Sequence, residues 1–187
     1  NKHNRHNKNK KGIRGIMEAL KTFDIKELLR RQAMLDEKFK DKMGTEEIDP
    51  NKIRVAYIDE VGEFIHELKP KWCYWKNNFK ETDKRKTLEE LSDCMHFALS
   101  LKNNKKGQEF LSKTVWSKFL GGAVVLSDKI EENLIQLSNI LNLEFLSIWF
   151  ELVGKILENL DVSQEEFLKI HHGKWLKNMN ERTKESY

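Results

Sequence analysis

Two pairs of acidic residues recur at helical spacing in the first half of the chain. Glu60 and Glu63 are three residues apart, and so are Glu90 and Asp93. Because that step returns to nearly the same face of an α-helix, each pair would present two carboxylates side by side. Both segments are rich in apolar residues, so the carboxylates would approach a core, where they repel one another unless protons or a cation neutralise them. Mg²⁺ prefers oxygen ligands, and the pattern therefore predicts a magnesium site formed by these four residues.

Either acidic pair alone has a simpler interpretation. Glu-x-x-Glu is most often a solvated helix face. Glu90 also stands three residues after Thr87, which is the spacing of a capping box, and its carboxylate would then reach back to the Thr87 backbone instead of a metal. Two pairs on consecutive apolar helices, joined by a segment with Trp72, Trp75 and Lys76, favour the metal site.

The order of the motifs around these residues resembles a known family. Glu-x-x-Glu is followed by Pro-x-Trp-x-x-Trp-Lys and then by Glu-Leu-x-Asp-x-x-His-Phe. This order is similar to that of the dimeric all-α dUTPases, which belong with MazG-type proteins to the all-α nucleoside triphosphate pyrophosphohydrolases. Trp72 and His96 point to the uracil-specific branch. The resemblance implies a homodimer that hydrolyses dUTP to dUMP and pyrophosphate with Mg²⁺, by attack at the α-phosphorus, with each site completed by the other subunit.

Residue chemistry and this resemblance together give the expected roles of individual residues. Glu60 or Glu63 would take the proton from the attacking water. Trp72 would stack on the uracil, and His96 would pack against it or form a hydrogen bond with it. The family places a Gln and an Asn or Asp near the uracil on its first helix, where this chain has Gln32 and Asp36. The full set of implied substrate-binding residues is Gln32, Trp72, Lys76, His96, Lys174, Asn178 and Arg182.

The last three of these residues recur near the C-terminus. Lys174, Asn178 and Arg182 repeat every four residues and would line one stripe of a helix. In the family, a Lys, an Asn and an Arg of this region bind phosphates. The step from Asn to Arg is four residues here instead of three, so Lys177 and Asn180 stay alternatives to Lys174 and Asn178.

The segments that must position these side chains are predicted to be helices. Apolar residues recur at helical spacing, and only two prolines and nine glycines interrupt the chain. Thr22 or Asp24 would cap the first helix, Asp49 before Pro50 would start the second, and Ser163 would cap the last. The sequence therefore predicts an all-α multi-helix bundle. The expected helices lie at about 24–43, 50–69, 87–102, 110–120, 123–141, 143–160 and 164–184, with an aromatic and basic loop at 70–86.

Length and composition place these helices in one domain. The chain has 187 residues and a net charge of +4, and much of the positive excess lies in the polar residues at its start. We therefore expect a flexible basic tail at 1–14 and a single all-α domain at 15–187. No apolar run is long enough to predict a membrane span. The two cysteines, Cys73 and Cys94, form no disulfide framework, so a cytoplasmic location is expected.

Two other functions stay open from the sequence. A MazG-like pyrophosphohydrolase would carry the same acidic pairs with a different base preference. A non-catalytic helical protein would bind a partner or nucleic acid through the basic tail. Nucleic-acid binding is not expected, because the tail lacks the aromatic residues that stack on bases. Within the uracil-specific interpretation, dUDP stays open as a second substrate.

Overall fold

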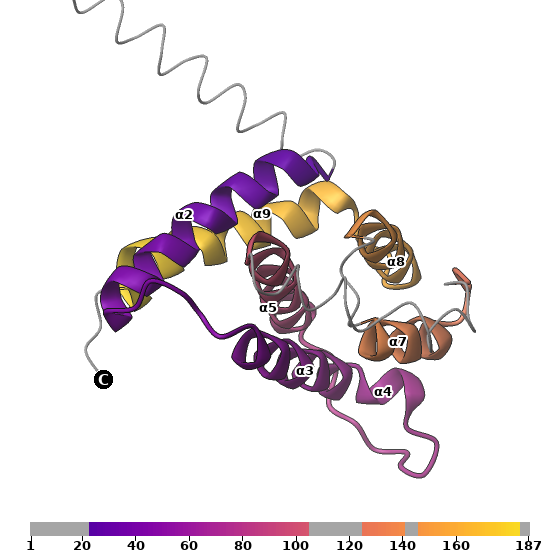
Figure 1. The fold of residues 1–187 in the computed structure, drawn as a ribbon. Coiled ribbons are helices and arrows are strands. Elements are labelled where there is room, and N and C mark those ends of the chain that lie inside the picture. The colour runs from indigo at the N-terminus through magenta and orange to yellow at the C-terminus, as the bar shows by residue number, and fades with distance from the viewer. Residues whose placement is uncertain (1–22, 105–124, 141–145, 184–187) are drawn as a thin grey trace, which may run out of the picture.

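The computed structural model of the protein describes residues 23–104, 125–140 and 146–183 (Figure 1). Those residues form α-helices and one π-helical turn, and no strand occurs among them. The predicted all-α bundle is therefore confirmed. Within the described ranges, no helix has both the length and the apolar character that crossing a membrane requires. The expected basic tail at 1–14 and the expected helix at 110–120 lie outside the described residues.

The first two helices begin and end where local signals predict. Helix α2 (Ile25–Met43) is capped by Asp24, whose carboxylate accepts a hydrogen bond from the backbone of the first turn. It ends at Gly44, which has a φ of 63° and so adopts the left-handed conformation that glycine tolerates best. Helix α3 (Pro50–Glu67) starts with its proline directly after the cap Asp49. Both starts confirm the predictions.

The segment between the acidic pairs differs from the prediction. Residues Lys69–Trp72 form a short helix, α4, and helix α5 (Lys84–Asn103) begins before Thr87. The cap of α5 is Asp83, whose carboxylate accepts from the backbone of the first turn, and the Thr87 hydroxyl donates to the Asp83 carbonyl at 2.9 Å. The predicted capping box at Thr87 is therefore wrong, because Asp83 caps at least as well and lets the helix start earlier. As a result, the Glu90 side chain has no capping role at the start of α5.

The second half of the chain contains four further elements. Helix α7 (Ile130–Asn139) begins later than the predicted 123, because the side chain of Asn133 accepts from the Ser127 N–H at 3.0 Å and holds the preceding residues in a turn. Helix α8 spans Leu146–Asn159, and helix α9 spans Gln164–Lys177. The last element is a π-helical turn, η2 (Asn178–Arg182), where the sequence predicts a continuous helix.

Helix α5 lies in the middle of the bundle, as Figure 1 shows. Helices α2, α3 and α9 all pack against it, and α7 packs on α3 and α8. The fully buried side chains include Phe64 of α3, Leu91 and Met95 of α5, and Trp149 of α8. Burying each such side chain contributes about 1.5–3 kcal/mol. Because α5 is held on several sides, its polar residues have well-defined neighbours.

The cap of α5 gives a testable consequence. Asp83→Ala removes the side chain that satisfies the first turn, and we expect the free energy of unfolding to fall by about 1 kcal/mol. The measurement is urea denaturation followed by circular dichroism. Glu81→Ala is a matched control, since Glu81 is also exposed and acidic but precedes the helix. An Asp83→Ala protein as stable as the control would show that α5 is not capped there.

Candidate metal and nucleotide site

Three carboxylates meet where α3 packs against α5. Glu60 of α3 and Glu90 and Asp93 of α5 each offer one oxygen, and these oxygens all lie within 4.8 Å of one another. We call these three residues the acidic cluster. The fourth predicted ligand, Glu63, is exposed, but its charge is close enough to affect the pKa of Glu60 and of Glu90. It therefore lies at the margin of the cluster and not inside it.

The acidic cluster carries more negative charge than its surroundings neutralise. Burial, followed by the nearby charges of Asp93, Glu63 and Glu90, raises the pKa of Glu60 to about 7. Burial also raises the pKa of Glu90 and of Asp93, against the opposing effect of Lys174. Closely spaced, partly buried carboxylates with raised pKa values favour the approach of a hard cation. The donor set, which is oxygen only, fits Mg²⁺.

Lys174 of α9 is the positive partner of this cluster. Its ammonium group donates to the Asp93 carboxylate, and both side chains are largely buried. Asn178, one turn later, is also buried, whereas the alternatives Lys177 and Asn180 are both exposed. The structure thus turns Lys174 and Asn178 inward.

Arg182 completes the stripe at the C-terminal end. Its side chain is exposed, and its positive charge lowers the pKa of Asp93 and of His96. Arg182 is therefore on the side of the molecule that carries the acidic cluster. The backbone of the same residue accepts a hydrogen bond from Lys42 at 2.5 Å, which ties η2 to α2.

A buried polar chain runs from α5 to α2. His96 Nδ1 lies 2.7 Å from Gln32 Oε1, and Gln32 Nε2 donates to Asp36 Oδ1 at 2.7 Å. All three side chains are buried. Burial, together with nearby positive groups, lowers the pKa of His96 well below its usual value, so the ring is neutral. The predicted base-binding residues Gln32 and His96 are thus in direct contact.

Three contacts that no sequence pattern predicts hold α9 in place. His171 Nδ1 lies 2.9 Å from Ser92 Oγ, and the His171 ring packs against the His96 ring at a tilt of 34°, with 4.3 Å between ring centroids. One turn further along α9, the Trp175 indole donates to the Arg31 carbonyl at 3.1 Å. The partners in these contacts are about 80 and 140 residues apart in the chain, so no local sequence pattern predicts that they meet.

Trp72 and Lys76 lie elsewhere in the described chain. The Trp72 indole donates to the Ile65 carbonyl at 2.8 Å, and α4 packs on α3 and α7. Figure 1 shows α4 well separated from α2, so the structure does not bring Trp72 to Gln32 within one chain. Lys76 is exposed, with its ammonium group 5.5 Å from the centre of the Phe79 ring.

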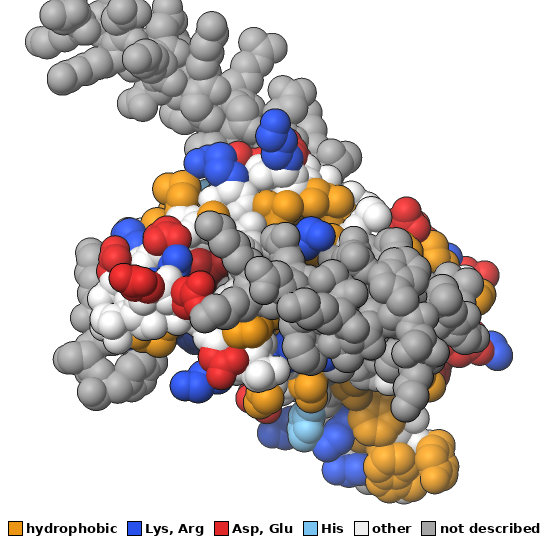
Figure 2. Space-filling view, in the orientation of Figure 1, with side chains coloured by type: hydrophobic (Ala, Val, Ile, Leu, Met, Phe, Trp, Pro, Cys, Tyr) orange, Lys and Arg blue, Asp and Glu red, His pale blue; other side chains and the backbone are white. Residues whose placement is uncertain are grey.

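The residues after α4 form an exposed aromatic surface. Tyr74 is 90% exposed and Trp75 is 63% exposed, and their rings pack edge to face. Figure 2 shows hydrophobic side chains gathered at the corner of the molecule where Figure 1 places this segment. Single exposed apolar residues are common, but adjacent exposed aromatic rings are typical of a contact surface.

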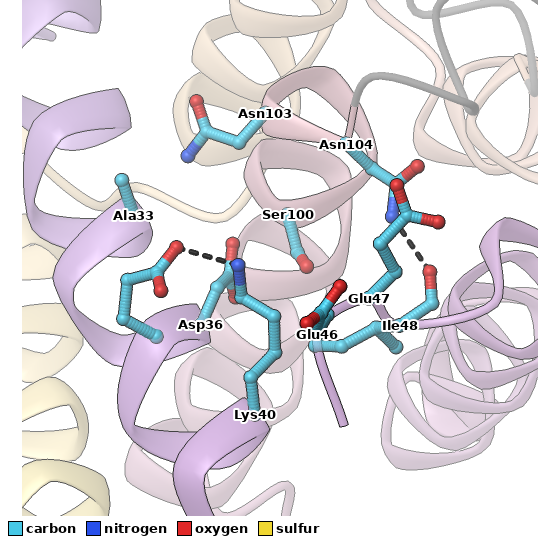
Figure 3. A pocket seen from close by; sticks show the side chains of 10 residues that line it. Ala33, Asp36, Lys40, Glu46, Glu47, Ile48, Ser100, Asn103 and Asn104 are labelled. Carbon is cyan, nitrogen blue, oxygen red and sulfur yellow. Dashed lines mark hydrogen bonds and ion pairs between the residues drawn. The ribbon is translucent and has the colours of Figure 1, made fainter. Parts of the chain in front are cut away.

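A cavity of about 320 Å³ opens beside Asp36, which lies on its wall (Figure 3). Its walls come from α2, from residues 46–48 and from the end of α5. Asp36 and Ser100 lie beside each other on the wall. The buried chain that includes Gln32 and His96 therefore reaches this cavity at its Asp36 end.

A family model described as dUTPase matches residues 24–187, which is most of the chain. No curated protein matches the chain, and no solved structure does. The matched range contains the acidic cluster, the polar chain from His96 to Asp36, and the C-terminal stripe with Lys174. The match favours the uracil-specific interpretation over the two alternatives that the sequence leaves open.

The raised pKa of Glu60 makes the stability of the cation-free protein depend on pH. Folded protein retains a proton on Glu60 that the unfolded chain has released, so the stability from this group is full below pH 4.5 and is lost as the pH rises through about 7. Glu60→Gln cannot ionise. With allowance for solvent screening, we expect the free energy of unfolding of Glu60→Gln to exceed that of the wild type by about 1–2 kcal/mol at pH 8. At pH 4 the two free energies of unfolding should be equal.

Urea denaturation in the presence of a chelator measures this difference. Adding Mg²⁺ at pH 8 should stabilise the wild type more than Glu60→Gln, because the variant has lost a ligand. A difference that is the same at both pH values, and that Mg²⁺ leaves unchanged, would show that Glu60 is not part of a charged cation site.

Proposed function

The chain belongs to the dUTPase family and is a dUTP diphosphatase, and we propose that it cleaves dUTP to dUMP and pyrophosphate at the acidic cluster. The observation that supports this site is the approach of Glu60, Glu90 and Asp93 to within 4.8 Å. Their carboxylates come from two helices whose packing is the most extensive in the described fold. The site is therefore built on rigid elements, as a catalytic constellation requires.

We propose that Glu60, Glu90 and Asp93 hold Mg²⁺. Burial raises the pKa of all three carboxylates, neighbouring carboxylates add to the shift of Glu60 and of Glu90, and an oxygen-only donor set suits this cation. When bound, Mg²⁺ would neutralise charge on the triphosphate and make a nearby water more acidic. The remaining carboxylate, Glu63, is exposed at the margin of the cluster and is free to accept the proton of the attacking water.

The C-terminal stripe is suited to the phosphates. Lys174 is held on Asp93, and its ammonium group can exchange this partner for a phosphate oxygen when the nucleotide arrives. Asn178 lies one turn further along and Arg182 two turns, on the same side of the molecule. We propose that Lys174 and Arg182 stabilise the negative charge that develops on the phosphate oxygens, with Asn178 as a neutral donor.

The base would lie against Gln32 and His96. Trp72 is too distant within one chain to stack on it, since α4 is separated from α2 (Figure 1). We propose a homodimer in which Trp72 and Lys76 reach the nucleotide bound by the partner subunit. The exposed aromatic surface at Tyr74 and Trp75 supports this proposal, because burial of these rings would stabilise the dimer.

A cytoplasmic location is part of the proposal. Cys73 and Cys94 are both free, which agrees with a reducing compartment.

A panel of nucleotides tests the proposed function directly. The purified chain is incubated with dUTP, dCTP, dTTP or dGTP, with and without Mg²⁺, and the products are identified. We expect dUMP and pyrophosphate from dUTP, and only with the cation. Preferred turnover of another nucleotide would favour a MazG-like activity, and no turnover of any nucleotide would contradict the proposed function.

Two carboxylates of α3 are predicted to behave differently. Glu63→Gln should lower kcat by about 10²–10⁴-fold while leaving the affinity for Mn²⁺, used as a spectroscopic substitute for Mg²⁺, unchanged. Glu60→Gln should weaken Mn²⁺ binding as well. Asp59→Asn is the control, because Asp59 is exposed and outside the acidic cluster. If Glu63→Gln retained full kcat, Glu63 could not be the proton acceptor.

Mixed dimers test the placement of Trp72. Trp72→Ala should raise KM for dUTP, because a stacked base is worth about 1–3 kcal/mol. When Trp72→Ala subunits are mixed with Glu63→Gln subunits, half of the sites in each mixed dimer would combine an intact cluster with an intact Trp72 of the partner. Turnover at low dUTP should then exceed that of either variant alone. No gain on mixing would place Trp72 in the site of its own chain.

A further inference from the structure

The last helical turn of the described chain departs from α-helical hydrogen bonding. At the end of η2, the Thr183 N–H donates to the Asn178 carbonyl, five residues back, at 3.3 Å. A continuing α-helix would direct this N–H to the Met179 carbonyl, four residues back. Met179 is buried, and a buried carbonyl needs a donor. Groups outside the helix backbone must therefore satisfy this carbonyl, in a kind of turn that is rare and occurs frequently at functional sites.

Two side chains replace the missing donor. Lys38 Nζ of α2 donates to the Met179 carbonyl at 3.0 Å, and the Thr183 hydroxyl donates to the same oxygen at 3.1 Å. Both lone pairs of this oxygen are thus used. The ammonium group of Lys38 is also positive, and a positive group is favourable at the C-terminal end of a helix. With these donors present, the π-helical turn leaves no unsatisfied carbonyl at Met179.

A second lysine of α2 holds the other end of η2. Lys42, one turn after Lys38, donates to the Arg182 carbonyl at 2.5 Å. Helix α2 packs against η2, and Figure 1 shows the end of α9 beside α2. The two lysines are about 140 residues earlier in the chain than the carbonyls they contact. The shape of η2 therefore depends on the packing of the bundle and not on the local sequence alone.

The π-helical turn changes the side of the helix on which Arg182 lies. An α-helix turns about 100° per residue, so eight α-helical residues would place Arg182 about 80° around the axis from Lys174. A π-helical turn contains more than four residues, so the step from Asn178 to Arg182 falls short of a full turn and reverses part of this rotation. Arg182 then lies nearer to the line through Lys174 and Asn178. Its positive charge acts on Asp93, the partner of Lys174, which agrees with this placement.

On the basis of the proposed function, we propose that Lys38 is a positioning residue, which holds η2 in its π-helical form and so directs Arg182 to the phosphates of the nucleotide. Lys38 donates to a backbone carbonyl and acts on the substrate only through Arg182. Without the ammonium group of Lys38, the Met179 carbonyl regains the Thr183 N–H as its partner, and the turn becomes α-helical. Arg182 then rotates around the axis of α9, away from the line of Lys174.

Crystal structures of the full chain test this proposal without substrate. The wild type is compared with Lys38→Met, because methionine is also long and unbranched but has no donor. We expect the Thr183 N–H to donate to the Asn178 carbonyl in the wild type and to the Met179 carbonyl in Lys38→Met. A wild type with an α-helical turn, or a variant that keeps the π-helical turn, would overturn the proposal. This comparison does not need turnover of dUTP, so it separates a failure of this inference from a failure of the proposed function.

A double-mutant cycle tests whether Lys38 acts through Arg182. Lys38→Met should lower kcat for dUTP by about 10–100-fold, because a catalytic group displaced by about 1 Å can cost this much, while the affinity for Mn²⁺ stays the same. Arg182→Gln should also lower kcat, and adding Lys38→Met to it should cause almost no further loss. Lys38→Arg keeps a charged donor and should retain most of kcat. Lys26→Met is the control, because Lys26 is an exposed lysine near the start of α2.

The loss of kcat in the two backgrounds distinguishes positioning from a general effect on stability. An equal loss from Lys38→Met with and without Arg182→Gln would overturn the proposal, since Lys38 would then act independently of Arg182. A kcat that Lys38→Met leaves unchanged, or lowers no more than Lys26→Met does, would overturn it as well.

Discussion

The repulsion among three carboxylates at the contact of α3 and α5 is the constraint on which the site depends. The packing of these helices places Glu60, Glu90 and Asp93 close together and partly out of water, and their pKa values rise as a result. Hydrophobic contacts elsewhere in the bundle must stabilise an arrangement that is unfavourable by itself. Lys174 of α9 neutralises part of the negative charge of the cluster. In the proposed function, the negative charge that remains attracts a divalent cation and, through it, a polyphosphate.

In the proposed function, helix α5 connects the metal site to the residues that would bind the base. Asp93 belongs to the acidic cluster, and His96, one turn later, contacts Gln32 of α2. Because α5 is the central helix, these residues keep a fixed spacing along a rigid axis. A nucleotide also has phosphates at one end and a base at the other. One helix can therefore hold the residues for the phosphates and the residues for the base at a fixed distance from each other.

Local signals in the sequence were sufficient for most of the fold, and the spacing of the acidic residues was sufficient to predict that Glu60, Glu90 and Asp93 lie close together. The caps Asp24, Asp49 and Ser163 start helices where predicted, because capping is decided by a few neighbouring residues. The start of α5 was misjudged because Asp83 and Thr87 compete, and only packing along the whole helix decides between them. The buried polar chain from Asp36 to His96 joins residues 60 positions apart, and no periodicity reveals which amide group faces which partner.

The most direct test of this account is to locate the cation. Crystals grown with Mn²⁺ in place of Mg²⁺ and measured at the manganese absorption edge give an anomalous difference map that shows the ion independently of the protein atoms. The account predicts a peak bounded by carboxylate oxygens of Glu60, Glu90 and Asp93. A map with no peak there, and with Lys174 still on Asp93, would contradict the claim that the acidic cluster is a metal site.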